Sequence, residues 1–67
     1  MINTKLIRKR MESMKISQGD LAKALDIAQS TCNLKLNNKR QLTLSEADTI
    51  ASVLKIPMKD FGAYFFA

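Results

Sequence analysis

Apolar residues recur at helical intervals along the first half of the chain, and their spacing predicts three short helices. The first runs from about Thr4 to Met14. Its apolar side chains at i, i+4 and i+7 share one helical face: Ile7, Met11 and Met14. The polar side chains beside them are expected to face water: Arg8, Lys9 and Glu12.

The second and third predicted helices follow closely. Ser17 suits the N-cap of a helix through Leu25, because its hydroxyl can accept a bond from a free backbone N–H, and Asp20 complements the helix dipole. The buried stripe predicted for this helix is Leu21, Ala24 and Leu25. The third helix is predicted from Ala28 to Asn37. In this helix Cys32 and Leu36 are expected to point inward. Its polar residues Gln29, Ser30 and Asn33 are expected to point outward.

Two further helices are predicted in the second half. Thr43 and Glu46 have the spacing of a capping box at a helix start. The apolar residues that follow at helical intervals are Ala47, Ile50, Ala51 and Leu54. Pro57 suits the first turn of a fifth helix, roughly Met58 to Phe65. Since no segment alternates with period two, the pattern predicts an all-α fold, a compact five-helix bundle that forms a single domain over residues 1–67.

Composition narrows the function classes. A 67-residue chain with 46% hydrophobic residues can fill one small core and leaves no room for a second domain. Eleven Lys and Arg against six Asp and Glu give a net charge of +5. Such a basic balance is typical of nucleic-acid-binding domains, but surplus lysine also serves solubility and suits acidic protein partners. Charge alone therefore leaves these interpretations open.

Several kinds of chemistry are not expected. Cys32 is the only cysteine and histidine is absent, so neither an internal disulfide nor a Cys/His zinc site can form, and no cofactor is expected. Cys32 is expected to be a small buried apolar residue, because no base stands nearby to activate its thiol. Without paired carboxylates or histidine, we expect no enzyme. Without an apolar run long enough for a signal peptide or membrane span, we expect a cytoplasmic protein and no membrane partner.

Residues 17–40 read SQGDLAKALDIAQSTCNLKLNNKR and resemble the lambda-repressor and Cro-like helix-turn-helix family. The segments that carry the likeness are Ser17-Gln18 at a helix start, Leu21-Ala22, Gln29-Ser30-Thr31 at the next helix start, and Asn37-Asn38-Lys39-Arg40. Helices before and after complete the five-helix pattern of the family, so the resemblance covers nearly the whole chain. The sequence departs from it where members commonly carry glycine: Lys15, Asp26 and Asn38. Its own two glycines lie inside predicted helices, and the sequence gives no reason for either: Gly19 and Gly62.

The resemblance implies that the third helix enters the major groove of double-stranded DNA. Gln29 would then pair with adenine through its amide, Ser30 would offer a hydroxyl, and Leu34 would pack on a thymine methyl. Asn33 is a flanking candidate one turn beyond Gln29. The alternative for the polar residues is an ordinary solvated face, and for Leu34 a core or partner contact.

Phosphate contacts are the second role that the resemblance implies. The candidates lie at a helix start or in the loop after the third helix: Gln18, Asn37, Lys39 and Arg40. Simple surface polarity is their alternative. Two further cations are expected to add only long-range attraction: Arg8 and Arg10.

The C-terminal aromatic residues have two expected uses. Phe61 and Phe65 share a helical face and are expected to close the bundle. Tyr64 and Phe66 face elsewhere, and if exposed they form a dimer patch.

Two functions follow from these expectations. The first is a phage-type or bacterial repressor that occupies a roughly palindromic operator as a homodimer. The second is an antirepressor or antitoxin-like interaction module of the same fold, which binds another regulator such as a repressor protein. Leu34 on the predicted reading face favours this alternative.

Overall fold

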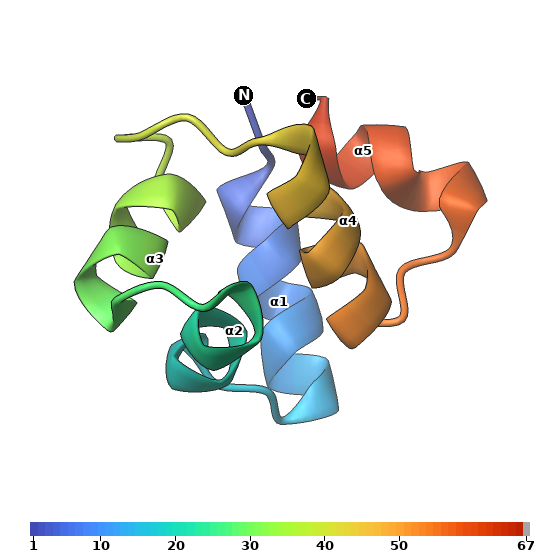
Figure 1. Ribbon diagram of the computed structural model, residues 1–67. Coiled ribbons are helices and arrows are strands. Elements are labelled where there is room, and N and C mark those ends of the chain that lie inside the picture. Colours follow the sequence, from blue (N-terminus) through green and yellow to red (C-terminus); the bar gives the residue numbers. More distant parts are fainter. Residues whose placement is uncertain (67) are drawn as a thin grey trace.

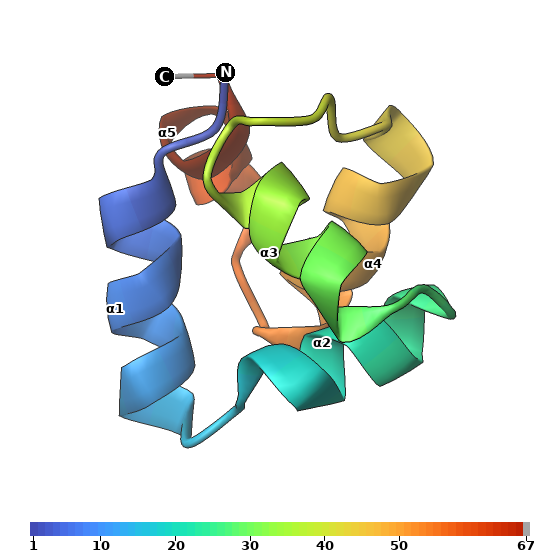
Figure 2. The same cartoon turned by 90° about the vertical axis from the view of Figure 1, so that its left-hand side faces the viewer.

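The computed structural model describes residues 1–66, which form five α-helices and one turn of 3-10 helix (Figure 1). In chain order these are α1 (Thr4–Met14), α2 (Gln18–Leu25), α3 (Gln29–Leu36), α4 (Leu44–Val53), η1 (Met58–Asp60) and α5 (Phe61–Phe65). No strand occurs in this range, so the predicted all-α fold is confirmed. Figures 1 and 2 show α2 at one end of the bundle, and α5 with the N-terminus at the other.

A single apolar core joins the helices. Its buried members come from every α-helix and from the segments beside them: Ile2, Ile7, Met11, Leu21, Ala22, Cys32, Leu36, Ala47, Ile50, Ala51, Leu54, Ile56 and Phe65. The predicted inward faces of α1, α3 and α4 are confirmed, except that Met14 is only half-buried. The stripe predicted for α2 was wrong at Ala24, which is exposed. Ala22 is buried instead, because Leu21, Ala22 and Leu25 are the residues on the face that packs inward.

Polar side chains cap the starts of α1, α2 and α4. In the capping box of α2, the Asp20 N–H donates to Ser17 Oγ (3.0 Å) and the Ser17 N–H donates to Asp20 Oδ2 (2.9 Å). The Ser17 contacts lower the pKa of the Asp20 carboxyl below its ordinary value. The same arrangement joins Thr43 and Glu46 at the start of α4. Both starts are therefore fixed by local sequence, as predicted.

Four turns after helices use a left-handed residue that is not glycine. Their φ angles are 57° at Lys15, 57° at Asp26, 59° at Asn38 and 52° at Lys55. In each turn, the N–H of the residue after the left-handed one donates to the carbonyl five positions earlier, which is the Schellman pattern. An example is the bond from the Ile16 N–H to the Met11 carbonyl (2.9 Å). In three of the four that next residue is an isoleucine packed on the core: Ile16, Ile27 and Ile56. Burial of this isoleucine offsets the left-handed strain.

The C-terminal helix differs from the prediction in its first turn. Pro57 has φ −62° and ψ 147°, so it stands in extended conformation before the helix, and its carbonyl accepts from the Asp60 N–H at 2.9 Å. That bond closes a 3-10 turn, and regular α-helix begins only at Phe61. The predicted pairing of Phe61 with Phe65 is confirmed by ring centroids 4.6 Å apart.

An ion pair connects α3 to α4. Lys35 Nζ lies 2.7 Å and 2.8 Å from the two carboxylate oxygens of Glu46, and the side chains are 12% and 17% exposed. Lys35 Nζ also donates to the Gln41 carbonyl at 3.4 Å. Burial alone would raise the pKa of Glu46, but the bonds from Lys35 and Thr43 outweigh it, and the pKa is lowered. This pair therefore anchors the loop between α3 and α4.

Because the folded pKa of Glu46 is lowered, its contribution to stability should be complete above the ordinary glutamate pKa of about 4.3 and should fall as pH drops through the lowered value. Glu46→Gln removes the titrating group, and we expect it to cost about 1 kcal/mol at pH 7. Thermal unfolding followed by circular dichroism from pH 7 to pH 3 measures both proteins. The difference in melting temperature should shrink toward low pH; a difference that stays constant would contradict this assignment.

Candidate nucleic-acid interface

One helix, α3, presents a polar face to solvent. Figure 2 shows α3 foremost in the molecule, with α2 below it. Cys32 and Leu36 fix it to the core, so the opposite side is left open. The exposed residues there include every base-reading candidate: Gln29, Ser30, Asn33 and Leu34, the last with 38% of its surface exposed. The structure therefore brings these four residues to one accessible helix.

The start of α2 lies beside the start of α3. Gln18 is half-buried, and its Nε2 donates to the backbone carbonyl of Gln29 at 3.4 Å. A Cβ built on Gly19 would lie 3.7 Å from Gln29 Nε2, an ordinary van der Waals contact. A Cβ would therefore fit at Gly19, and neither the space around it nor its backbone conformation requires glycine.

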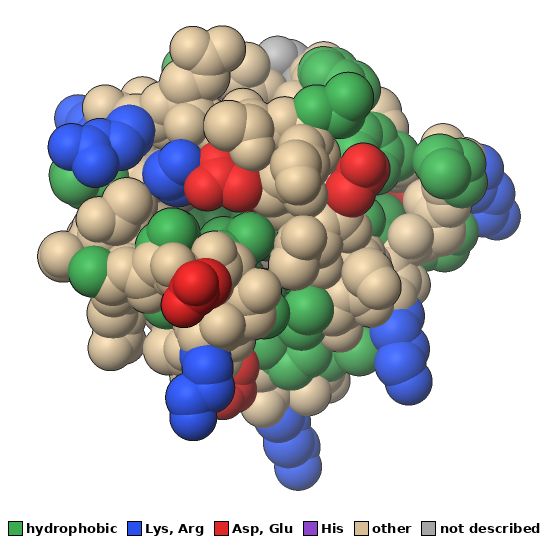
Figure 3. All heavy atoms as spheres, in the orientation of Figure 1, with side chains coloured by type: hydrophobic (Ala, Val, Ile, Leu, Met, Phe, Trp, Pro, Cys, Tyr) green, Lys and Arg blue, Asp and Glu red, His purple; other side chains and the backbone are tan. Residues whose placement is uncertain are grey.

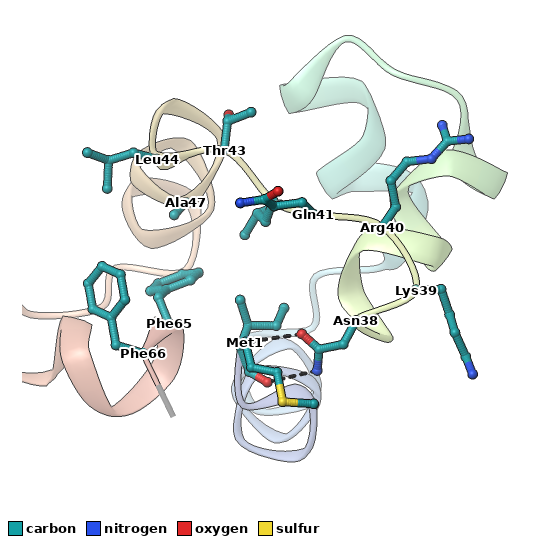
Figure 4. Close-up of a pocket in the computed structure, with 12 residues that line it drawn as sticks. Met1, Asn38, Lys39, Arg40, Gln41, Thr43, Leu44, Ala47, Phe65 and Phe66 are labelled. Atoms are coloured by element: carbon teal, nitrogen blue, oxygen red, sulfur yellow. Dashed lines mark hydrogen bonds between the residues drawn. The ribbon is translucent and has the colours of Figure 1, made fainter.

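The loop after α3 carries the other predicted phosphate contacts. Asn37, Lys39 and Arg40 are all exposed. The Lys39 N–H donates to the Leu34 carbonyl (2.8 Å), which folds the loop back against α3. Figure 4 shows the side chains of Lys39 and Arg40 extending outward from this loop. Together with Gln18 and the exposed residues of α3, these residues form a set that we call the α3 surface: Gln18, Gln29, Ser30, Asn33, Leu34, Asn37, Lys39 and Arg40.

Asn38 ties this loop to the N-terminal segment. Its Oδ1 accepts from the Ile2 N–H (2.9 Å) and its Nδ2 donates to the Ile2 carbonyl (3.0 Å), as the dashed lines of Figure 4 show. The Asn38 amide thus satisfies both the N–H and the carbonyl of one backbone residue, Ile2. The loop that carries Lys39 and Arg40 is therefore held at both ends, by Asn38 here and by the Lys35 to Glu46 pair beyond it.

The expectation that Arg8 faces water was wrong, and both Arg8 and Arg10 make contacts within the protein that the sequence did not predict. Arg10 donates to the carbonyls of Leu54 (2.9 Å) and Lys55 (2.8 Å), where it caps the end of α4. Arg8 is half-buried and donates to side chains of α2 and α3. Helical periodicity assigned Arg8 to a solvated face, because it carries no information on how far a long side chain reaches toward other elements.

The charge around the α3 surface is positive. No Asp or Glu occurs from residue 27 to residue 45, whereas Lys35, Lys39 and Arg40 do. Within residues 1–66 the one ion pair is that of Lys35 with Glu46, so Lys39 and Arg40 keep their charge unneutralised by a contact. In Figure 3 basic side chains project around the edge of the molecule, with one group where the loop after α3 lies in Figure 1. This potential suits an anionic partner.

The single thiol of the chain lies away from this surface. Cys32 is fully buried, and burial raises the pKa of its thiol. The described part of the chain contains no cluster of three residues that could hold a metal ion. Within residues 1–66 no helix has the length and apolar character to cross a membrane. The predicted burial of Cys32 is confirmed.

A groove borders the loop that follows α3 and lies between the N-terminal segment, the start of α4 and the end of α5, so Lys39 and Arg40 of the α3 surface line part of it. Its volume is about 400 Å³, and Figure 4 shows Phe65, Phe66, Leu44 and Met1 around it. Of the two residues predicted for a dimer patch, Phe66 is 69% exposed. Tyr64 is half-buried against the core, and its carbonyl accepts from the Asn3 N–H at 2.8 Å.

Comparison with known proteins gives one match. A family model described as a Cro/C1-type HTH DNA-binding domain matches residues 6–65. This range includes all five α-helices except the first two residues of α1. Searches of curated proteins and of solved structures gave no match.

Proposed function

Because the chain belongs to the family of Cro/C1-type helix-turn-helix DNA-binding domains, we propose that it is a transcriptional repressor that reads operator DNA with α3 in the major groove. One observation carries this proposal: the exposed face of α3 is polar, free of carboxylates and flanked by cations. The protein binds in this proposal and performs no catalytic step. It would act in the cytoplasm as a dimer on DNA.

Base reading falls to the residues of α3. Gln29 stands at the first position of the helix, and its amide has the donor and acceptor that adenine N7 and N6 require. Ser30 offers a hydroxyl beside it, and Asn33 lies one turn further on. Leu34 has enough exposed surface to contact a thymine methyl.

Phosphate binding falls to the residues around α3. Lys39 and Arg40 supply charge from the anchored loop, while Gln18 and Asn37 supply amide donors at the ends of α2 and α3. Such contacts hold a protein on the duplex without reading its sequence. They also release counterions, so binding should weaken as salt rises.

Arg40→Ala should weaken binding to every duplex by a similar factor, because a phosphate contact carries no sequence information. The slope of log K against log salt should become shallower by about 1. Fluorescence anisotropy titrations at several salt concentrations measure this. The control is Lys59→Ala, which removes the same charge from η1, far from α3 in Figure 1, and should change the slope less. A loss confined to one DNA sequence would contradict the phosphate role of Arg40.

The dimer proposal rests on exposed apolar side chains around the groove. Leu44 and Met1 are exposed beside Phe66, so an apolar patch extends beyond the aromatic ring itself. A short reading helix contacts few base pairs, and a second copy doubles the contacted site. Because Tyr64 is half-buried, it would pack beneath the residues of this interface and would not contact the second copy directly.

Phe66→Asp should lower self-association and operator affinity together, because a carboxylate in an apolar contact is costly to bury. Helical content should stay nearly unchanged, since Phe66 lies outside the core. Sedimentation velocity and anisotropy measure the two effects. Met58→Asp is the matched control, because Met58 is 86% exposed and does not line the groove. A wild type that is monomeric with and without DNA would remove the dimer from the account.

The exposure of Leu34 favours a second function. A leucine with 38% of its surface exposed on the candidate reading face suits a protein contact as well as a thymine methyl. In this alternative the chain binds another repressor protein and not DNA. Co-purification with such a protein, together with no affinity for any duplex, would favour the alternative over the repressor.

A further inference from the structure

The guanidinium of Arg8 lies where α1, α2 and the outer face of α3 meet. Its Nη1 is 3.5 Å from Gln18 Oε1, and its Nη2 is 3.4 Å from the same oxygen. Nη2 is also 3.3 Å from Asn33 Oδ1 and 3.2 Å from Asn37 Oδ1. One residue of α1 therefore contacts three members of the α3 surface, at sequence separations of 10, 25 and 29.

This contact fixes which way the amides point. A guanidinium has only donors, so each amide must turn its oxygen toward Arg8. Asn33 Oδ1 also accepts from Asn37 Nδ2 at 3.0 Å, one helical turn away. An amide oxygen has two lone pairs, and on Asn33 both are thus engaged.

The other end of the Asn33 amide is open. Asn33 is exposed, and its Nδ2 donates to no acceptor in the part of the chain that the structure describes. Within this network Asn33 can therefore donate two hydrogen bonds outward and accept none. An asparagine without such neighbours presents a donor and an acceptor side by side, which is the pair that adenine N7 and N6 recognise.

We infer that Arg8 is a specificity-determining residue of the proposed reading surface, because it turns Asn33 into a donor-only reader. The base that Asn33 contacts should offer acceptors in the major groove, which are N7 and O6 of guanine or O4 of thymine. Adenine fits less well, because its N6 amino group would meet no acceptor. This inference rests on the proposed function, since it concerns bases read by α3.

The effect differs from that of charge alone. Arg8 has no carboxylate partner within residues 1–66, so it adds positive potential as the exposed Lys5 and Lys9 of the same helix do. Neither lysine donates to Asn33 or Asn37. Lys9→Met is therefore a control that removes the same charge and leaves the amide network intact.

Selection of bound sequences from random duplex DNA tests the inference with wild type, Asn33→Ala, Arg8→Met and Lys9→Met. Asn33→Ala identifies the base pair that Asn33 reads, as the position whose preference disappears. At this position the wild type should enrich guanine or thymine over adenine. Arg8→Met should raise the ratio of adenine to guanine by about fivefold or more, because the Asn33 oxygen becomes free to accept. Lys9→Met should leave all base preferences unchanged, and Arg8→Lys should retain much of the wild-type preference.

Two results overturn the inference while leaving the proposed function in place. One is a wild type that enriches adenine at the Asn33 position, a readout that needs no variant of Arg8 and holds even if Arg8→Met folds poorly. The other is a folded Arg8→Met, verified by circular dichroism, whose preferences match those of Lys9→Met. If the wild type enriches no sequence, the proposed function fails and the inference falls with it.

Discussion

Leu36→Ala is expected to lower the free energy of unfolding by about 2–5 kcal/mol. Leu36 is 1% exposed and belongs both to the core and to α3, so its loss leaves a cavity directly beneath the α3 surface. For a domain of this size, 1 kcal/mol shifts the melting temperature by about 4–8 °C, so a decrease of roughly 8–40 °C should follow.

Thermal and urea unfolding, followed by circular dichroism, measure this change. Leu44→Ala is the matched control, because Leu44 is 64% exposed and its truncation should cost less than about 0.5 kcal/mol. Equal losses in the two variants would mean that α3 is not anchored through Leu36.

Gln29→Ala is expected to reduce affinity for the preferred operator by about 1–3 kcal/mol, because the amide pair to adenine is lost and no core volume is removed. Binding to random duplex should persist, since phosphate contacts drive it. Stability should barely change, because Gln29 is exposed.

The measurement is a titration against the operator, against operators changed at each base pair, and against random duplex at one salt concentration. Gln41→Ala provides the matched control, an exposed glutamine in the loop outside α3. If Gln29→Ala keeps full operator affinity and the same base preferences, α3 is not the reader, and the protein-binding alternative gains support.

The starts of α2 and α4 were predictable because short-range chemistry determines them. Ser17 and Thr43 each have an acidic residue three positions on, and both pairs form capping boxes in the structure. Helix ends were harder to predict, because the sequence lacks glycine at all four left-handed positions. The resemblance indicated three of these turns, while the turn at Lys55 was missed. An isoleucine directly after the left-handed residue was the available signal in three cases.

The candidate site was predictable as a set of positions but not as a network. Periodicity placed Gln29, Ser30 and Asn33 on the outer face of α3, and the structure confirms their exposure. It could not show that Arg8 reaches Asn33 across 25 positions, or that Arg10 reaches Leu54 across 44, because long side chains follow tertiary packing rather than helical phase. The roles of these residues on DNA stay predictions.

The central claim, sequence-specific DNA binding through α3, is tested most directly by one ratio of affinities. After selection from random DNA, the dissociation constant of the wild type is measured by anisotropy for the selected duplex and for a scrambled duplex of equal composition, both at physiological salt. The account predicts that the selected duplex binds on the order of 10³-fold or more tightly. A ratio near one would contradict it.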